Sequence, residues 1–335
     1  MNDDQMMQRA IAAAARSRMV SPPNPWVGCA IVTVDGRIFE GSTEAPGSRH
    51  AEIVALDAAR AARADLAGAT VYTTLEPCSH HGRTPPCVDA LIAAGVSRVV
   101  SALTDPDPKV AGQGFAKLRA AGISVDVGEG SRAAADQLRA YLHHRRTGRP
   151  FVVLKMASTL DGRTAAADGS SQWITGDEAR RSAHQLRAES QAIVVGAGTV
   201  RTDDPSLTTR LVDGPSPRRV VLGSAPADAK VHPCTEWTGP LPDLLEQLGR
   251  DGVVQLMVEG GARVAASFHR ENLVDRYVLY MAPAFMGGAD GTPLFAGNGA
   301  PTIADLRRGR LVSTRVVGGD IEVVIDACDH SKEQS

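Results

Sequence analysis

Three side chains that bind zinc well stand close together in the first half of the chain. They are His50, Cys78 and Cys87, and eight residues separate the two cysteines. One imidazole and two thiolates give three ligands suited to Zn²⁺ and leave a fourth tetrahedral position for water, which is the pattern of a catalytic site. Glu52, at the start of an expected helix, is placed to take a proton from that water and return it to a leaving amine.

The order of these residues matches the signature of the zinc deaminases, in which His-x-Glu is followed by Pro-Cys and a later Cys. Many deaminases have only two residues between the cysteines, so the longer spacing here is a departure. A structural zinc site, or buried cysteines without metal, are the alternatives, because free cysteine is often a core residue. His80 and His81 are alternative ligands, although His50 already supplies the third.

Alternating helical and strand-like stretches must hold these residues. The first half predicts a helix over 5–18, with Asp3 or Asp4 as its N-cap, and a strand over 27–34 that ends in the hairpin signal Asp35-Gly36. It further predicts helices over 51–64, 87–94, 114–121 and 131–146 and strands over 69–75, 96–103 and 123–127. Such alternation indicates an α/β layer architecture.

Gly148 and Pro150 interrupt this pattern and mark the expected domain boundary, with one domain over 1–147 and another over 148–330. The second half predicts helices over 177–189 and 241–248. Strands are expected over 151–156, 192–195, 218–222, 253–258, 276–282, 311–317 and 321–325. Glycine turns follow two of these strands, at 196–199 and 260–262, and could present backbone N–H groups to phosphate oxygens.

Composition bounds the function. The 335 residues favour two domains, and a net charge of −2 argues against a nucleic-acid-binding protein. No apolar run reaches the ~18 residues of a membrane span, and the acidic start is unlike a signal peptide. With five cysteines, an odd number, a disulfide framework is not expected. We therefore expect a cytoplasmic protein that binds neither nucleic acid nor membrane.

Several ordered motifs resemble the bifunctional deaminase/reductase family of riboflavin biosynthesis. The first half carries Leu75-Glu-Pro-Cys-Ser-His-His-Gly-Arg-Thr-Pro-Pro-Cys87, with Pro23-Asn-Pro25 and Val27-Gly28 upstream. The second half carries Lys155-Met-Ala-Ser-Thr-Leu-Asp-Gly-Arg163, Ser170-Ser-Gln-Trp-Ile-Thr175, Gly198-Thr-Val-Arg-Thr-Asp-Asp-Pro205 and Val258-Glu-Gly-Gly-Ala262. The resemblance covers nearly the whole chain.

The resemblance implies a cytidine-deaminase-like three-layer domain followed by a dihydrofolate-reductase-like domain. The first would hydrolyse an amine from a diaminopyrimidinone ribosylamine phosphate, and the second would reduce the ribosyl group of the product to ribityl with NADPH. His50, Cys78 and Cys87 would bind Zn²⁺, and Glu52 would be the proton shuttle. In the deaminase half, substrate would be bound by Asn24, His80 and Arg83.

In the reductase half, the resemblance divides the expected site residues between two ligands. Cofactor residues would be Ala157, Trp173, Thr199, Asp203, Gly261, Ala262 and Arg263. Substrate residues would be Lys155, Ser171, Arg187, Leu207, Arg210 and Glu259. The arginines suit a phosphate because of their forked donors. Taken alone, the glycine turns could be ordinary loops, Trp173 a half-buried packing residue, and Asp203 part of a turn.

Two departures from the family pattern matter. Trp26 stands where the family often has a polar or basic residue, and the segment 222–253 is shorter than usual, so the strand beside the adenosine end of NADPH could be trimmed. Preference for NADPH over NADH is open. One alternative is a deaminase whose second domain binds but does not reduce; another is a zinc-stabilised nucleic-acid module. The relatives suggest a homo-oligomer, a dimer or tetramer.

Overall fold

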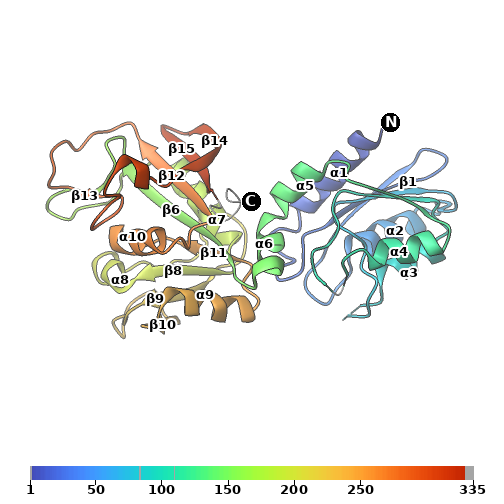
Figure 1. Ribbon diagram of the computed structural model, residues 1–335, viewed down its shortest axis with the longest axis horizontal. Coiled ribbons are helices and arrows are strands. Elements are labelled where there is room, and N and C mark those ends of the chain that lie inside the picture. Colours follow the sequence, from blue (N-terminus) through green and yellow to red (C-terminus); the bar gives the residue numbers. More distant parts are fainter. Residues whose placement is uncertain (1, 83, 109, 329–335) are drawn as a thin grey trace. The chain divides into compact units, whose positions relative to one another are not determined.

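The computed structural model describes residues 2–82, 84–108 and 110–328. The chain divides into two compact units, Met1–Gly148 and Arg149–Ser335. Among the described residues, no helix has both the length and the apolar character needed to cross a membrane. Each unit is an α/β fold with its own sheet, and we describe them separately (Figure 1).

The first unit is built on a five-stranded sheet with the order β2-β1-β3-β4-β5. The strands are β1 (Gly28–Val32), β2 (Ile38–Ser42), β3 (Thr70–Thr73), β4 (Arg98–Ser101) and β5 (Ser124–Val127). β1 runs antiparallel to β2 and β3, while β3, β4 and β5 are parallel to one another. The Asp35-Gly36 hairpin is confirmed, since Gly36 adopts φ +85° between β1 and β2.

Helices cover both faces of this sheet, which makes three layers (Figure 1). One face holds α1 (Asp3–Ala15) and α5 (Ser131–Gln137), and the other holds α2 (Ala51–Ala61), α3 (Cys87–Ala93) and α4 (Gln113–Ala120). The alanine-rich helices pack very closely: a Cβ on Gly28 would lie 1.9 Å from the Ala10 oxygen, and one on Gly41 would lie 2.1 Å from the Ala51 oxygen. Small residues on the strands and on the helices therefore fix how closely α1 and α2 pack against the two faces of the sheet.

Two local expectations for the first unit were wrong. The N-cap of α1 is Asn2, whose side chain accepts from the Gln5 backbone N–H in a capping box, so neither Asp3 nor Asp4 caps it. The helix expected over 131–146 is two helices, α5 and α6 (Arg139–Thr147), which meet at Leu138. Trp26 is buried there and donates from Nε1 to the Gln137 carbonyl oxygen at 3.0 Å.

The second unit is built on an eight-stranded sheet with the order β10-β9-β8-β11-β6-β12-β15-β14. The first six strands in that order are parallel, and β15 and β14 join antiparallel at one edge. The strands are β6 (Phe151–Thr159), β8 (Ala192–Gly196), β9 (Arg218–Leu222), β10 (Thr235–Trp237), β11 (Gln255–Val258), β12 (Arg276–Ala282), β14 (Gly309–Val317) and β15 (Asp320–Ala327). A separate pair consists of β7 (Arg163–Ala165) and β13 (Thr292–Pro293).

Alternate residues of the central strands point into two cores. Val194 of β8 packs with leucines of α9 (Leu241–Arg250) and with Phe268 of α10 (Ala262–Arg270). Its neighbour Val195 packs on the opposite face with Val200 of α8 (Ala197–Asp203), and Leu186 of α7 (Asp177–Ala188) packs against that core. A short 3-10 helix spans Ile303–Asp305. Burial on both faces is why these strands read as continuous apolar runs.

Candidate active sites

The three expected zinc ligands come together in the first unit. His50 is the N-cap of α2, Cys78 lies in the loop after β3, and Cys87 is the first residue of α3. His50 Nδ1 lies 3.5 Å from Cys78 Sγ and 3.3 Å from Cys87 Sγ, and the three ligand atoms all lie within 4.8 Å of one another. Among the described residues only these three form such a group, and neither His80 nor His81 belongs to it.

The donor set fits zinc. With Zn–N and Zn–S bonds of about 2.05 and 2.3 Å, tetrahedral geometry separates nitrogen from sulfur by ~3.6 Å, close to the separations seen here. The backbone N–H of Cys87 donates to Cys78 Sγ at 3.3 Å. A hydrogen bond from the Cys87 thiol, aided by the His50 imidazole, lowers the pKa of the Cys78 thiol and so favours the thiolate that binds metal.

Glu52 lies on the first turn of α2 and is only 3% exposed. Burial, reinforced by the negative charge of Cys78, raises the pKa of its carboxyl. A raised pKa makes the carboxyl a better proton acceptor than an ordinary glutamate, which suits a proton shuttle. The helix therefore delivers one ligand from its N-cap and the acid from its second residue.

The substrate residues expected in this unit are only partly placed. Asn24 lies in the turn before β1, where its backbone N–H donates to the Ser21 oxygen at 2.9 Å. His80 is exposed in the loop between Cys78 and Cys87. Arg83 lies outside the described residues. The sequence reasoning missed Glu76, a buried acid two residues before Cys78, because its backbone donors lie in the later segment from Asp105 to Gly114.

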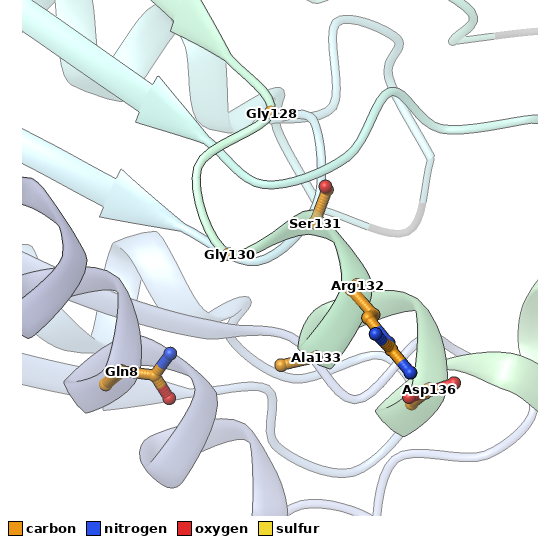
Figure 2. A pocket seen from close by; sticks show the side chains of 7 residues that line it. All are labelled: Gln8, Gly128, Gly130, Ser131, Arg132, Ala133 and Asp136. Atoms are coloured by element: carbon orange, nitrogen blue, oxygen red, sulfur yellow. The ribbon is translucent and has the colours of Figure 1, made fainter.

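A shallow hollow of about 460 Å³ opens on the first unit between the start of α5 and α1 (Figure 2). Its lining residues are Gln8, Gly128, Gly130, Ser131, Arg132, Ala133 and Asp136. None of them is a zinc ligand or an expected substrate residue, and Arg132 and Asp136 are its charged side chains. The hollow is thus separate from the metal-binding group in its residues and its chemistry.

In the second unit, three expected substrate residues form one charged cluster. Glu259, just after β11, accepts from Arg187 Nε at 2.9 Å and Nη2 at 3.0 Å, and from Lys155 Nζ at 3.2 Å. Burial alone would raise its pKa, but the charges of Lys155 and Arg187 outweigh that effect and lower the pKa of Glu259 to about 2. Lys155 reaches the cluster because β6 pairs with β11. The carboxylate is therefore ionised at any physiological pH.

The Arg187 side chain is buried, and its remaining nitrogen Nη1 donates to the Thr208 carbonyl oxygen at 3.1 Å. The Nε and Nη2 atoms of the Arg187 guanidinium therefore both face Glu259 in this structure. Beside it, His184 accepts at Nδ1 from the Arg210 backbone N–H at 3.1 Å. Burial and the charges of Arg187 and Arg210 lower the pKa of His184 to about 4, so the ring is neutral at pH 7. The Arg210 side chain is exposed, and its Nη1 donates to Ser206 Oγ at 3.5 Å.

Glycines crowd together where the parallel strands β8, β9 and β11 end. A Cβ on Gly196 or Gly260 would lie within 2.8 Å of the Val264 side chain, and Gly223 turns with φ +98° above Ala197. A Cβ on Gly261 would lie 3.4 Å from Thr199 Oγ1, so the starts of α8 and α10 are neighbours. In open α/β sheets, ligands bind beyond the carboxyl ends of the strands. The expected cofactor residues Thr199, Gly261 and Ala262 lie there.

The other expected cofactor and substrate residues differ in exposure. Trp173 is 64% exposed, with the Arg180 guanidinium 4.5 Å from its ring centre, so it is not a half-buried packing residue. Asp203, at the end of α8, is an exposed residue, and partial burial of its carboxyl raises its pKa. Leu207 has φ +53° and a side chain 2% exposed in the core, which leaves only its backbone for a ligand. Ala157 and Ser171 are half-buried, and Arg263 is exposed.

Comparison with known proteins assigns both units. Residues 1–103 match the family model described as the cytidine and deoxycytidylate deaminase zinc-binding region, and residues 150–323 match the RibD C-terminal domain. The riboflavin biosynthesis protein RibD of Chlamydia muridarum is 42% identical over 90% of this chain and 88% of its own. The RibD protein of Escherichia coli is 39% identical over 96% of this chain and 98% of its own.

Solved structures agree over the full length. A form of RibD from Acinetobacter baumannii superposes with a TM-score of 0.90 at 36% identity, covering 98% of this chain and 99% of that one. The diaminohydroxyphosphoribosylaminopyrimidine deaminase/5-amino-6-(5-phosphoribosylamino)uracil reductase of Thermotoga maritima gives 0.89 at 32% identity, covering 97% and 99%. This chain belongs to the RibD family: it is a bifunctional pyrimidine deaminase and NADPH-dependent reductase of riboflavin biosynthesis, with its zinc site at His50, Cys78 and Cys87.

Proposed function

We propose that residues 1–147 hydrolyse one amine from 2,5-diamino-6-ribosylaminopyrimidinone 5′-phosphate. Residues 148–330 then reduce the ribosyl group of the product to ribityl with NADPH. The observation that carries this proposal is that each unit has its own complete group of functional side chains, Glu52 beside the zinc ligands in one and Glu259 with two cations in the other. The name of the Thermotoga maritima relative gives the same two activities, a deaminase and a reductase.

In the deaminase unit, Glu52 moves the protons. His50, Cys78 and Cys87 would hold the zinc ion, which when bound makes water a good nucleophile at neutral pH. Glu52 would accept one proton from the attacking water and deliver a proton to the amine, which would leave as ammonia. Because Glu52 is buried, bulk water has no direct route to replace it.

The loop between the cysteines supplies contacts for the rest of the substrate. We assign His80 and Arg83 to the phosphate and Asn24 to the pyrimidine. His80 supports this by its exposed position in the loop that carries Cys78. An amide such as Asn24 can donate to and accept from a pyrimidine edge at once, which a charged side chain cannot. The pyrimidine would thus be oriented by a neutral amide, and the phosphate held by His80 and Arg83.

In the reductase unit, Lys155 faces the sugar. NADPH, when bound, supplies the hydride for the ribose carbon. Lys155 would donate a hydrogen bond, and then a proton, to the ring oxygen released when the sugar opens. Glu259 holds the Lys155 ammonium at 3.2 Å, and Arg187 fixes Glu259 through two hydrogen bonds. Arg210, which is exposed, would bind the phosphate, with Ser171 and the Leu207 backbone completing the substrate contacts.

The cofactor would lie across the glycine-lined strand ends. Thr199, Gly261, Ala262 and Arg263 would meet its phosphates, because the N-cap of α10 is Gly261 and no side chain caps the first backbone N–H groups of the helix. Trp173 would stack against it with the ring face that Arg180 leaves open. Ala157 and Asp203 would line the remaining wall.

A paired assay on the zinc-loaded protein tests the proposal. The diaminopyrimidinone ribosylamine phosphate is supplied with and without NADPH, and ammonia and NADPH absorbance are followed together. We expect ammonia in both cases and NADPH oxidation whenever the cofactor is present. Ammonia without NADPH oxidation would support the alternative in which the second unit binds but does not reduce. No ammonia in either case would refute the deaminase assignment.

We also propose that the enzyme is a homodimer joined through the edge strand β14. Leu311 is opposite Ile325 and Val316 is opposite Ile321, so all four lie on one face of the β14–β15 pair. Leu311 and Val316 are 59% and 77% exposed, whereas the opposite face is held by Arg310–Asp326 and Arg315–Glu322 pairs. A long apolar edge strand is a liability unless it is covered, and the same strand of a second copy can cover it.

Light scattering after size-exclusion chromatography tests the dimer. The wild-type protein should have the mass of two chains and the variant Val316→Glu that of one. Glu271→Gln, an exposed change outside the strand, should keep the wild-type mass. A monomeric wild type, or a dimer unaffected by Val316→Glu, would refute this interface.

We place the enzyme in the cytoplasm, where thiolates such as those of Cys78 and Cys87 stay reduced.

A further inference from the structure

Glu76 is buried beside the metal-binding loop, and backbone groups surround its carboxylate. Oε2 accepts from the Gly112 N–H at 2.9 Å and from the Asp105 N–H at 3.3 Å, while Oε1 accepts from the Gly114 N–H at 2.9 Å. Its side chain is 4% exposed. A buried carboxylate with three backbone donors is well satisfied, and these donors come from the segment that follows β4 rather than from its own.

The same carboxylate caps a helix that has no cap of its own. The N-cap of α4 is Gly112, with φ +82° and no side chain, and Gly114 is the second residue of the helix. A Cβ on Gly114 would lie 2.2 Å from the Pro77 carbonyl oxygen, so the first turn of α4 rests directly on the Pro77–Cys78 peptide. Glu76 therefore supplies the acceptor that an N-cap side chain would normally provide, and ties α4 to the chain just before Cys78.

Cys78 is held on its other side by α3. The Val88 N–H donates to the Cys78 carbonyl oxygen at 3.2 Å, and the Cys87 N–H donates to its sulfur at 3.3 Å. The ligand thus sits between two fixed points: the start of α3, which carries the other cysteine, and the Glu76 carboxylate. With one fixed point removed, Cys78 could still reach the metal, but its thiolate would no longer be preset at the ligand position.

We propose that Glu76 is a positioning residue for the zinc site, which holds Cys78 in place by anchoring the chain before it to the start of α4. The inference rests on the family's zinc site and not on the substrate roles proposed above. Residues that orient metal ligands typically change metal affinity by about 10–100-fold when mutated. Because Glu76 acts through the backbone, the effect should lie at the lower end.

Two substitutions separate the parts of this role. Glu76→Gln keeps the length but turns one oxygen into an NH₂ group that faces backbone N–H donors. Glu76→Asp keeps the charge but is one methylene shorter, so it can satisfy only part of the three-donor set. The matched control is Asp3→Asn: Asp3 pairs with Arg98 and Tyr72 on the α1 side of the same sheet, away from the ligand loop.

The experiment uses the full-length, zinc-loaded protein. Zinc release to a chromogenic chelator is timed, the visible spectrum of the cobalt-substituted protein is recorded, and melting of the metal-free protein is measured. We expect release about tenfold faster and a shifted cobalt spectrum for Glu76→Gln, partial recovery for Glu76→Asp, and wild-type release and spectrum for Asp3→Asn despite its lower melting temperature.

Two results would overturn the proposal. One is wild-type zinc release and cobalt spectrum in both Glu76 variants. The other is equal acceleration of release in Asp3→Asn, because that would make the effect a consequence of lower stability alone. If Glu76→Gln fails to fold, the zinc release rate and cobalt spectrum of Glu76→Asp, compared with those of Asp3→Asn, still test whether Glu76 positions Cys78. Metal release is measured without substrate, so refuting the role of Glu76 would not refute the proposed reactions. Likewise, an absence of ammonia in the paired assay would not refute the role of Glu76 at the zinc site.

Discussion

Replacing Glu52 by glutamine removes the proton shuttle while leaving the metal ligands in place. The side chain is 3% exposed, so glutamine fills the same buried space and no solvent channel opens to substitute another base. General acid–base catalysis by a positioned side chain contributes about 10²–10⁴-fold. Because Glu52 serves both the attack and the departure of the amine, we expect a loss of at least about 10³-fold, equivalent to ~4 kcal/mol of barrier.

The assay follows ammonia release at saturating substrate, with zinc content measured on the same sample. His50, Cys78 and Cys87 are unchanged, so Glu52→Gln should retain one zinc per chain. The reductase site belongs to the other unit, and the variant should therefore oxidise NADPH at the wild-type rate when the deaminated product is supplied. Glu40→Gln, a change to a carboxylate that pairs with Arg9 outside the metal site, is the matched control and should behave as wild type.

Three results would refute this reasoning in different ways. Ammonia release within tenfold of wild type would mean that Glu52 does not carry the proton. Loss of zinc from Glu52→Gln would mean that the carboxyl acts through the metal site rather than on the reacting groups. Loss of NADPH oxidation with the supplied product would mean that the two activities are coupled.

Three further predictions concern the metal, one charged cluster and one packing contact. Stripping zinc with a chelator should abolish ammonia release but leave NADPH oxidation with the supplied deaminated product, measured on the same sample. The folded-state pKa of Glu259 is about 2, below the ordinary value of 4.5, so its stabilisation is complete above pH ~4.5 and is lost as the pH falls toward 2. Glu259→Gln should therefore flatten the fall in melting temperature between pH 5 and pH 2, as measured by scanning calorimetry. Gly41→Ala would force a Cβ against the Ala51 oxygen and displace α2, so we expect a loss of about 3 kcal/mol in chemical unfolding and weaker zinc binding.

The deaminase chemistry could be predicted from the sequence because its parts are local. His50 is the N-cap of α2 and Glu52 its second residue, while Cys78 lies in the loop after β3 and Cys87 begins α3. Residue type and spacing therefore already specify the ligand group. The break between α5 and α6 could not be predicted in this way. The pattern over 131–146 is helical throughout, but the Gln137 carbonyl receives the indole N–H of Trp26, 111 residues earlier in the chain.

The charged cluster of the reductase shows the same limit. Lys155, Arg187 and Glu259 could each be assigned to the substrate by resemblance, but their mutual contacts span up to 104 positions and depend on the pairing of β6 with β11. Forked donors suggested that Arg187 would bind a phosphate. In the folded chain two of its nitrogens face Glu259, a partner that residue type alone does not reveal. Glu76 was missed for the same reason, since all three of its donors lie in a later segment.

The shortened segment 222–253 raised doubt about the strand at the adenosine end of the cofactor. β10 is present but has only three residues, which pair in parallel with the last three of β9. Trp237, its last residue, accepts the Gly223 N–H at 2.8 Å, and its Nε1 donates to the Gly239 and Pro240 oxygens. The backbone of this short strand thus fixes the Gly223 turn, which lies against Ala197 at the start of α8. We therefore expect the truncation to leave NADPH binding intact, and its effect on the choice between NADPH and NADH to depend on the residues that follow Gly223.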